Sequence, residues 1–434
     1  MGSEWKSTTL GEVIELKRGY DLPKRLRVQG EVPLISSAGV SDFHSESKVA
    51  GPGVVTGRYG TIGEVFFSPQ DFWPLNTTLY VRDFKGNDPK FVYYFLKTLN
   101  FEEFSDKAAV PGVNRNHVHM AEVTVPTCVS EQEAIAHILG TLDDKIELNR
   151  WMNATLEEMA QALFKSWFVD FDPVIDNALA AGNPIPKELA PRADVREKAL
   201  ANGSIQQGSV DHSTLSDPKS LFPAAFEFND ELGWIPEGWP LESIYSLIDV
   251  IYGAPFKSSK FTAEGDGTPV IRIRDLKTGR PQNWTEEDHP KKTLITTGDV
   301  VVGMDAEFRA TIWPGREAYL NQRLFFAQPK VESVNSFYIK EILRPQLEFE
   351  ENTQVGTTVA HLGKKEIDQF KALNPSREVL ALYAQATDPL LSRIINNLKA
   401  TSNLTKLRDT LLPKLISGDL RLSDPNELVV EIAG

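Results

Sequence analysis

Basic, amide and aromatic side chains gather in glycine-punctuated loops of this chain. Lys17 and Arg18 directly precede a glycine and a tyrosine, and Arg58 and Tyr59 lie in a loop, residues 57–63, that contains three glycines. Glycine lets a backbone approach a phosphate closely, and an arginine can donate two parallel hydrogen bonds to the edge of a guanine. These residue types and spacings indicate binding to a nucleic acid.

Further residues suited to phosphates or base edges occur in two separate stretches of the chain. In the first stretch, the candidates for contact with double-stranded DNA are Lys17, Arg18, Lys24, Arg25, Arg27, Arg58, Tyr59, Asn76, Thr77 and Arg115. In the second stretch they are Lys257, Ser258, Lys260, Arg272, Arg274, Arg309, Asn321, Arg323 and Lys364. Any one of these is more often a solvated surface residue. Their recurrence in matching loops of both stretches strengthens the functional interpretation until it is about equal to the solvated-surface one.

Motifs that carry catalysis or hold a cofactor are missing from the sequence. It contains no GxxxxGK[ST] phosphate loop, no HExxH, no CxxC, no GxSxG and no Asn-Pro-Pro-aromatic stretch of the kind that adenine methyltransferases use. His117 and His119 could ligate a metal, but two imidazoles alone make a weak site. We therefore expect no catalytic residue, no metal site and no cofactor in this chain.

The elements that must position these loops occur twice. A globular stretch from Trp5 to Pro126 precedes one long heptad-patterned segment, and a stretch from Trp239 to Pro375 precedes another. The offset between corresponding residues changes slowly along the chain: Trp5 to Trp239 is 234 positions, Asn76 to Asn321 is 245, and Pro126 to Pro375 is 249. The chain is therefore expected to carry two similar heads.

The loops of the two heads differ in sequence. Residues 17–20 (KRGY) stand opposite residues 251–253 (IYG), and residues 76–78 (NTT) stand opposite residues 321–323 (NQR). Two identical heads would read a palindrome. Divergent heads should read two different half-sites.

The segment after the first head is expected to form one long helix over residues 130–168. Ser130 and Glu133 are spaced as a capping box, and apolar residues then recur at mostly three- and four-residue steps. Asn149 and Asn153 fall near the apolar seam, where a buried amide can fix the register of paired helices.

A second helix is expected over residues 376–418. Pro389 should kink it or divide a short first turn from the main helix, and Pro413 and Gly418 mark its end. Each apolar stripe needs a partner in water. The preferred interpretation pairs the two helices as an antiparallel coiled coil; the alternative packs each helix on its own head.

The charge of the chain is unevenly distributed. The formal net charge is −14, but residues 131–238 alone carry 8 basic and 19 acidic side chains, whereas residues 1–130 carry 14 and 15 and residues 239–376 carry 17 and 19. The near-neutral heads can therefore hold local basic patches, and the overall charge neither excludes nor supports DNA binding. No apolar run is long enough to span a bilayer, and one cysteine, Cys128, excludes an internal disulfide. We expect a cytoplasmic protein without a membrane partner.

Short β-branched runs between glycine, proline and asparagine turns predict an α/β fold: two similar mixed α/β domains separated by two long helices, with an internal pseudo-two-fold repeat. The expected boundaries are 1–129 for the first head, 130–170 for the first spacer helix, 171–235 for a linker, 236–375 for the second head, 376–418 for the second spacer helix and 419–434 for a C-terminal tail. The linker is rich in proline, alanine and glycine and too poor in apolar residues to form a core.

Three segments of the two helices resemble a known family. Residues 138–150 (ILGTLDDKIELNR) and 162–173 (ALFKSWFVDFDP) look like the central spacer of type I restriction-modification specificity subunits, and residues 407–418 (LRDTLLPKLISG) look like their distal spacer. Residues 10–13 and 239–242 fit the opening segments of their target-recognition domains. The resemblance follows the whole chain in order, although the heads match in layout only.

The resemblance implies a non-catalytic subunit in which each head reads one half of an asymmetric, gapped DNA target. The paired helices would set the gap and dock two modification subunits, which carry S-adenosylmethionine and methylate adenine. Two restriction subunits, translocases and nucleases that use ATP and Mg²⁺, would complete the enzyme. Two alternatives stay open at this point: a stand-alone DNA methyltransferase or nuclease, which lacks a visible cofactor motif, and a coiled-coil scaffold that reads no DNA.

Overall fold

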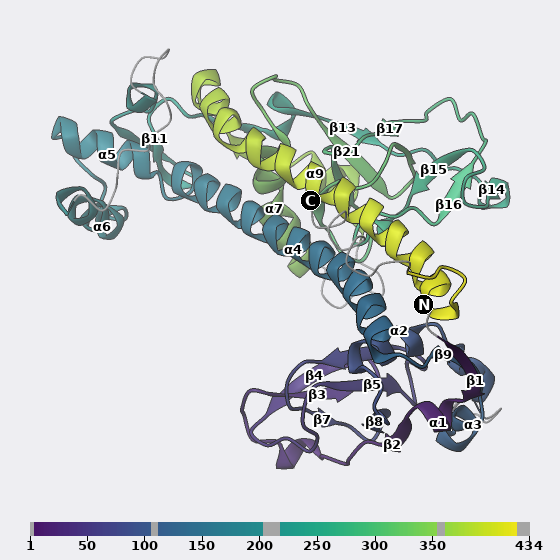
Figure 1. Cartoon of the computed structure of the whole chain (residues 1–434). Helices are drawn as coiled ribbons and strands as arrows, with labels where there is room; N and C mark the ends of the chain where they lie inside the picture. The colour runs from purple at the N-terminus through teal and green to yellow at the C-terminus, as the bar shows by residue number, and fades with distance from the viewer. Residues whose placement is uncertain (1–3, 106–111, 203–217, 354–360, 423–434) are drawn as a thin grey trace. The chain divides into compact units, whose positions relative to one another are not determined.

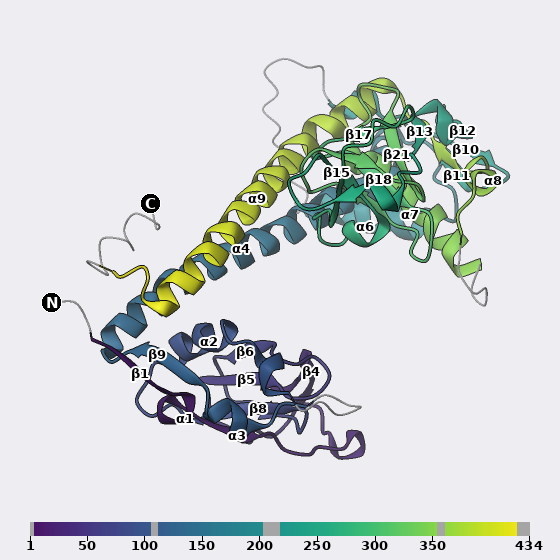
Figure 2. The same ribbon diagram turned by 90° about the vertical axis from the view of Figure 1, so that its right-hand side faces the viewer.

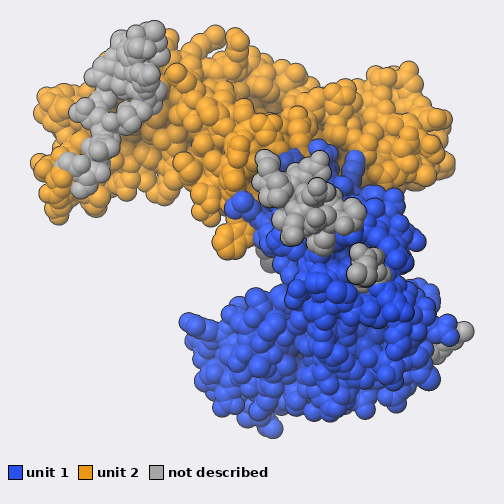
Figure 3. All heavy atoms as spheres, viewed as in Figure 1, with its two compact units in different colours: residues 1–148, 400–434 blue, residues 149–399 orange. Residues whose placement is uncertain are grey.

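The computed structural model describes residues 4–105, 112–202, 218–353 and 361–422. These residues divide into two compact units, one formed by residues 1–148 and 400–434 and the other by residues 149–399 (Figure 3). Each unit contains one head and parts of two long helices, α4 (Val129–Phe168) and α9 (Arg377–Ser417). The mixed α/β class expected from the sequence is confirmed.

The first head is built mainly of short antiparallel strands (Figure 1). Its elements are β1 (Trp5–Thr9), α1 (Leu10–Val13), β2 (Glu15–Arg18), η1 (Lys24–Leu26), β3 (Val32–Ser36), β4 (Gly39–His44), β5 (Gly53–Gly57), β6 (Val65–Ser68), β7 (Trp73–Pro74), β8 (Thr78–Asp83), α2 (Pro89–Lys97), η2 (Phe101–Phe104), α3 (Arg115–His119) and β9 (Glu122–Pro126). The central sheet has the order β2-β8-β5-β6, a second sheet has the order β4-β3-β7, and β1 pairs with β9.

The core of the first unit lies between its central sheet and the helices. Asp88 caps α2 by accepting a hydrogen bond from Phe91 N at 2.7 Å, and Pro89 follows it as the first helical residue. The apolar face of α2 then packs Phe91 and Phe95 into a cluster that includes Val54 of β5. This packing fixes the ends of β5 and β8, from which several candidate residues project.

The second head repeats this arrangement. Its elements are β12 (Leu241–Ser243), η4 (Ile244–Ser246), β13 (Ile248–Tyr252), η5 (Ser258–Lys260), β14 (Phe261–Thr262), β15 (Thr268–Ile271), η6 (Ile273–Asp275), β16 (Asn283–Thr285), β17 (Leu294–Ile295), β18 (Val300–Gly303), β19 (Ala310–Ile312), β20 (Ala318–Leu320), β21 (Leu324–Pro329), α7 (Ser336–Thr353), α8 (Lys364–Ile367) and β22 (Lys371–Leu373). The sheets have the orders β13-β21-β18-β19, β14-β16-β15-β20-β17 and β12-β22. The central sheet therefore matches β2-β8-β5-β6 strand for strand.

A glycine after the first central strand marks the same place in both heads. A Cβ on Gly19 would lie 2.2 Å from the carbonyl oxygen of Leu75, and a Cβ on Gly253 would lie 2.0 Å from that of Asn321. Neither glycine has a positive φ, so it is the lack of space that requires glycine here. Leu75 thus corresponds to Asn321, and the sequence-based pairing of Asn76 with Asn321 is wrong by one residue.

The pairing of the following strands gives the same correspondence between the two heads. β5 pairs with β8 so that Gly57 lies opposite Thr78, and β18 pairs with β21 so that Gly303 lies opposite Leu324. Counting back from the matched pair of Thr78 and Leu324 makes Arg323 the counterpart of Thr77. Sequence alone missed this register because the residues involved share no identity between the heads.

The two long helices pair in antiparallel fashion, as preferred from the sequence, and lie side by side in both views (Figures 1 and 2). In the second unit, Asn397 Nδ2 donates to Asn153 Oδ1 at 2.8 Å. In the first unit, Arg408 Nη1 donates to Asp143 Oδ1 at 2.7 Å. Residue numbers rise along α4 while those of their partners fall along α9, which establishes the antiparallel sense.

Two details of the helices differ from expectation. Pro389 lies inside an uninterrupted α9, so it does not divide a short first turn from the main helix. Ser130 lies inside α4, which begins at Val129, and its hydroxyl is 2.9 Å from Cys128 Sγ, so the expected capping box at Ser130 is not formed. The anchor of this helix end is Gln132, whose Nε2 donates to Pro126 O at 2.9 Å.

The described part of residues 171–235 is folded, contrary to the expectation of a linker without a core. It forms α5 (Asp172–Ala181), α6 (Ala190–Ala201), η3 (Pro218–Leu221) and the hairpin β10 (Phe226–Asn229) and β11 (Gly233–Pro236). Val174 and Phe222 join the core of the second unit. The polar run at 203–217 and most of the tail, at 423–434, lie outside the described residues.

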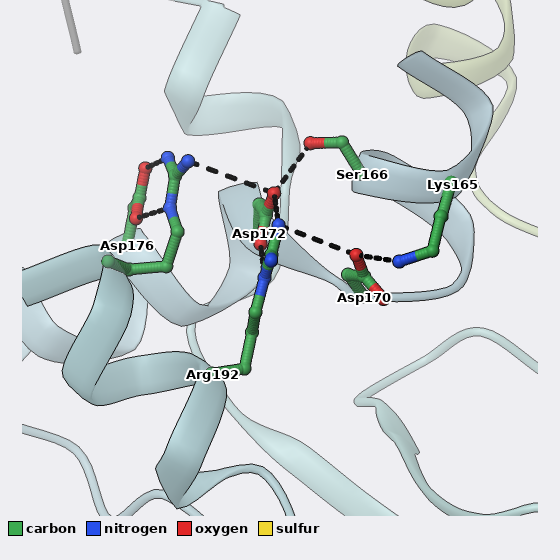
Figure 4. Close-up of polar contacts among 7 residues, drawn as sticks. Lys165, Ser166, Asp170, Asp172, Asp176 and Arg192 are labelled. Carbon is green, nitrogen blue, oxygen red and sulfur yellow. Dashed lines mark hydrogen bonds and ion pairs between the residues drawn. The ribbon is translucent and has the colours of Figure 1, made fainter. Parts of the chain in front are cut away.

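An ion-pair network holds α5 and α6 together at the end of α4 (Figure 4). Asp172 is buried and accepts hydrogen bonds at 2.7 Å from Arg192 and from Ser166. Arg196 Nη1 lies 3.7 Å from the same carboxylate, and Arg196 Nε donates to Asp176 at 2.9 Å. Composition alone suggested a solvated linker, because these paired charges were counted as polar.

Candidate nucleic-acid interface

Three arginines of the first head line one hollow in its surface. This hollow, here called the arginine hollow, has a volume of about 390 Å³ and is lined by Arg18, Arg58, Tyr59, Leu79, Gly112, Val113, Asn114, Arg115 and Asn116. Arg18 ends β2, Arg58 follows β5 and Arg115 begins α3, so the fold brings together residues from three distant segments. Guanidinium groups suit phosphates and guanine edges, since each offers donors in a planar fork.

Arg58 is the most firmly held of the three. Its backbone N donates to Thr77 O at 2.9 Å, and its Nε donates to Val113 O at 3.3 Å. Its guanidinium carbon lies 4.5 Å from the centroid of the Tyr59 ring. Stacking on an aromatic ring fixes the plane of a guanidinium, so this side chain presents its terminal nitrogens in a defined direction.

A second hollow is connected to the first by the hydrogen bond from Arg58 N to Thr77 O. This amide hollow has a volume of about 520 Å³ and is lined by Asp21, Leu22, Pro23, Lys24, Arg27, Ser36, Ser41, Leu75, Asn76 and Thr77. Asp21 touches residues of both hollows: its Oδ1 accepts a hydrogen bond from Asn76 Nδ2 and lies 4.0 Å from Arg18 Nη2. The Asp21 carboxylate therefore orients one amide and one guanidinium.

Lys17, Arg25 and Arg27 of the first head differ in how far they are engaged within the head. Lys17 points its Nζ at the Tyr20 ring, 5.5 Å from the centroid, and Arg25 lies exposed on η1 outside both hollows. Arg27 Nη1 donates to Asp42 Oδ2 at 3.0 Å, and this hydrogen bond holds the pKa of Asp42 below its usual range. Arg27 is thus partly engaged within the head.

Arg323 of the second head lies in a cluster with one carboxylate and one imidazole. Its Nε lies 3.6 Å from Asp305 Oδ2, and its Nη1 lies 3.3 and 3.4 Å from the two ring nitrogens of His361. His361 Nδ1 is in turn 2.7 Å from Asp305 Oδ1. The Arg323 side chain is 55% exposed, so a braced guanidinium reaches solvent here.

A second basic group of this head surrounds Glu287. Lys257 N donates to Glu287 Oε2 and Lys260 Nζ to Oε1, both at 3.1 Å, and Ser258 begins η5 between them. The hydrogen bond from the Lys257 backbone holds the pKa of Glu287 below its usual range, and the hydrogen bond from the Lys260 side chain adds to this effect. η5 matches η1 of the first head, where Lys24 stands in place of Ser258.

The other candidates of the second head are spread more widely. Arg272 is half-buried beside Asp275, whose Oδ2 accepts from Arg272 N at 2.9 Å, and Arg274 is exposed on η6. Arg309 is exposed before β19. Lys364 Nζ binds its own helix neighbour Asp368 at 2.6 Å.

Asn321 is buried, and its side-chain oxygen accepts a hydrogen bond from Gln322 N at 2.9 Å. The exposed amide of this loop is therefore Gln322. Asp21 and Asp305 were missed as parts of the site. The available signal for Asp21 was its position three residues after Arg18; no comparable signal linked Asp305 to Arg323.

Within the described ranges, no group of three or more His, Cys, Asp or Glu side chains is placed to hold a metal ion. Among the same residues, no helix is both long and apolar enough to cross a membrane.

Comparison with known proteins finds similarity to DNA specificity proteins. Residues 2–158 match the family model described as the type I restriction modification DNA specificity domain. The chain is 26% identical over 359 residues to the specificity subunit of the type I restriction enzyme HindI from Haemophilus influenzae, covering 76% of this chain and 77% of that subunit. It is 25% identical over 370 residues to the MjaIX specificity subunit of Methanocaldococcus jannaschii, covering 81% of this chain and 74% of that subunit.

A solved structure shares the fold. The S subunit of a type I restriction-modification system from M. genitalium aligns with a TM-score of 0.58 and 15% identity, covering 95% of this chain and 96% of that one. The similarity includes the two heads and the two long helices.

Proposed function

We propose that the chain is a DNA specificity subunit of a type I restriction-modification system, and that each of its heads reads one half of a gapped DNA target. Such a subunit is a non-catalytic component of the type I enzyme and carries no cofactor of its own. One observation supports separate reading by the two heads: their central sheets have the same strand order, but their loop residues differ. Arg58 and Tyr59 of the first head stand where the second has Met304 and Asp305.

The proposed contacts with DNA use the candidate residues of both heads. In the first head, phosphates and base edges would contact the arginine hollow and the amide hollow. In the second head, they would contact the Arg323 cluster and the Glu287 group. Phosphate contacts supply most of the salt-dependent affinity, whereas contacts to base edges supply the sequence preference. The acidic side chains within these groups orient the basic ones and add specificity by repelling misplaced phosphates.

The family indicates both a general assembly and a more detailed set of partner subunits. A type I specificity subunit works in a complex with other subunits and DNA. In finer detail, the proposal is that α4 and α9 set the gap between the half-sites and dock two modification subunits, which use S-adenosylmethionine. Two restriction subunits with ATP and Mg²⁺ would complete the assembly. The domain boundaries proposed for the two reading heads are residues 1–129 and 236–375.

An exchange of one head tests the proposed function. Residues 1–129 are replaced by the first head of another specificity subunit, and the chain is assembled with its modification subunits. Adenine methylation is then sequenced on a DNA library with randomised half-sites. One half of the recognised sequence should change and the other should stay. A change in both halves, or in neither, would contradict independent reading by the two heads.

A further inference from the structure

In each head, one hydrogen bond joins the backbones of two equivalent positions at the ends of two neighbouring strands. Arg58 supplies the donor N of this bond in the first head, and Arg323 supplies the acceptor O in the second. In the first head, Arg58 N donates to Thr77 O at 2.9 Å; in the second, Met304 N donates to Arg323 O at 3.0 Å. The matched strand ladders make Met304 the counterpart of Arg58 and Arg323 the counterpart of Thr77. Each head therefore carries one arginine at this pair of positions, supplied from a different strand.

The companion residue of each pair leaves room for the arginine. Met304 is only 7% exposed and packs into the core of the second unit, whereas Arg58 lines the arginine hollow. Thr77 is short and half-buried. A guanidinium is thus presented at the same ends of the central strands in both heads, although the sequence positions differ.

The backbone of the second head is bent to present its arginine. Arg323 has a φ of +70°, a left-handed conformation that residues other than glycine rarely adopt. Thr77, its counterpart, is not among the described non-glycine residues with positive φ. Such conformations persist where the surrounding structure enforces them, and they concentrate at functional sites. The strain is therefore tied to the arginine and not to the shared fold.

Asp305 and His361 brace this side chain. One proton arrangement satisfies all three residues: His361 Nδ1 donates to Asp305 Oδ1 across 2.7 Å, and His361 Nε2 accepts from Arg323 Nη1 across 3.4 Å. Within the described part of the chain, no contact of Arg323 Nη2 is present. Nη2 and the second hydrogen of Nη1 are therefore not used by the brace.

We infer that Arg323 and Arg58 are the residues with which the two heads read guanine, and that Asp305 and His361 are positioning residues for Arg323. The inference rests on the proposed function. Arginine recognises guanine by two parallel hydrogen bonds to O6 and N7, which require a guanidinium of fixed plane and direction. A phosphate contact, the other common role of an exposed arginine, positions the protein on DNA but carries no sequence information. The brace around Arg323 and the stacking of Arg58 on Tyr59 both fix the guanidinium as base reading requires.

The test measures base preference in the assembled complex with its modification subunits. Arg323→Gln should lower the preference for guanine at one position of one half-site by about 5- to 150-fold, the range of a lost bidentate contact, and leave the other half-site intact. Arg58→Gln should do the same at one position of the other half-site. Asp305→Asn and His361→Asn should weaken the same preference as Arg323→Gln by a smaller factor.

Two further variants separate base reading from charge. Arg323→Lys keeps the charge but loses the planar fork, so it should weaken the guanine preference while the salt dependence of binding stays unchanged. Arg316→Gln is the matched control, because Arg316 is 57% exposed and lies 3.5 Å from a carboxylate of the same head, and it should retain every preference.

An equal loss of binding to all sequences in Arg323→Gln, with a shallower salt dependence, would identify a phosphate contact and overturn the inference. The head exchange would still succeed in that case. Its failure would instead count against the proposed function itself.

Discussion

The buried carboxylate of Asp172 shows how a single charge can organise a segment that composition describes as a linker. Only 4% of its side chain is exposed, and Arg192, Arg196 and Ser166 surround it. Burial alone would raise the pKa of Asp172, but the hydrogen bonds from Arg192 and Ser166, aided by the charge of Arg196, outweigh burial and hold the pKa below its usual range. The charged form is therefore the one that stabilises α5 and α6.

This pKa direction predicts an acid-dependent loss of stability. Since the folded-state pKa of Asp172 lies below its unfolded value of about 4, its contribution is present above that pH and is lost as the pH falls through the folded value. Asp172→Asn should lower the free energy of unfolding by roughly 2 kcal/mol at pH 7, as expected for weakened hydrogen bonds between charged groups. The difference from the parent chain should shrink below about pH 4.

Urea unfolding of the second unit's helices, followed by circular dichroism across this pH range, measures the effect. Asp194→Asn makes the same chemical change at an exposed position of α6 and should have little effect. Equal losses in the two variants at pH 7 would show that the network does not stabilise the fold.

Residue types could be predicted from sequence better than their roles. Arg58 and Arg115 were selected as DNA candidates by type, and the fold brings them into one hollow. Asn321 was selected for the same reason, yet it is buried and bonded to its own loop. The direction of a side chain depends on the register of its strand. The register in the structure matches Asn321 with Leu75, one residue away from the match with Asn76 that the sequence suggested.

At the scale of elements, the paired helices followed from sequence because heptad spacing repeats over many turns. Asn153 was expected near the seam, and it is 9% exposed while its partner Asn397 is 4% exposed. The folded state of residues 171–202 was not anticipated. Its α5 and α6 are short, and their stability comes from ion pairs and from contacts with residues remote in sequence, such as Phe222.

The buried amide pair yields a prediction about the helix pair. Asn397→Leu removes the donor to Asn153 Oδ1 and leaves that amide buried without its partner, which should cost about 1–3 kcal/mol. Replacing both asparagines with leucine should recover most of that loss, because two apolar side chains leave no unsatisfied polar atom. The double variant should however pair with a less defined register.

Urea unfolding gives the stabilities, and cysteine cross-linking along the seam reports the register. Asn396→Leu, at the exposed neighbouring position, is the control. If it destabilises the chain as much as Asn397→Leu does, the buried amide pair has no special role.

At the scale of the whole molecule, the chain passes between its two units only within α4, at Leu148 and Asn149, and within α9, at Lys399 and Ala400. The acidic excess of the chain lies in residues 131–238, which include α4, while the heads are near neutral. An acidic helix repels the DNA backbone, so the charge distribution favours contact through the heads. This charge distribution agrees with the spacer role proposed for the helices.

A spacer of this kind predicts that gap length follows helix length. Seven residues inserted after Leu148 and seven after Lys399 add two turns to each helix and keep the apolar faces aligned. At about 1.5 Å per residue the spacer lengthens by roughly 10 Å, which corresponds to about three base pairs of B-DNA. Methylation of a DNA library with varied gaps should show a preferred gap about three base pairs longer, with both half-sites unchanged. Insertion into α4 alone, which leaves its added turns without a partner, should lower activity at every gap length. An unchanged preferred gap in the doubly extended chain would contradict the spacer role of the two helices.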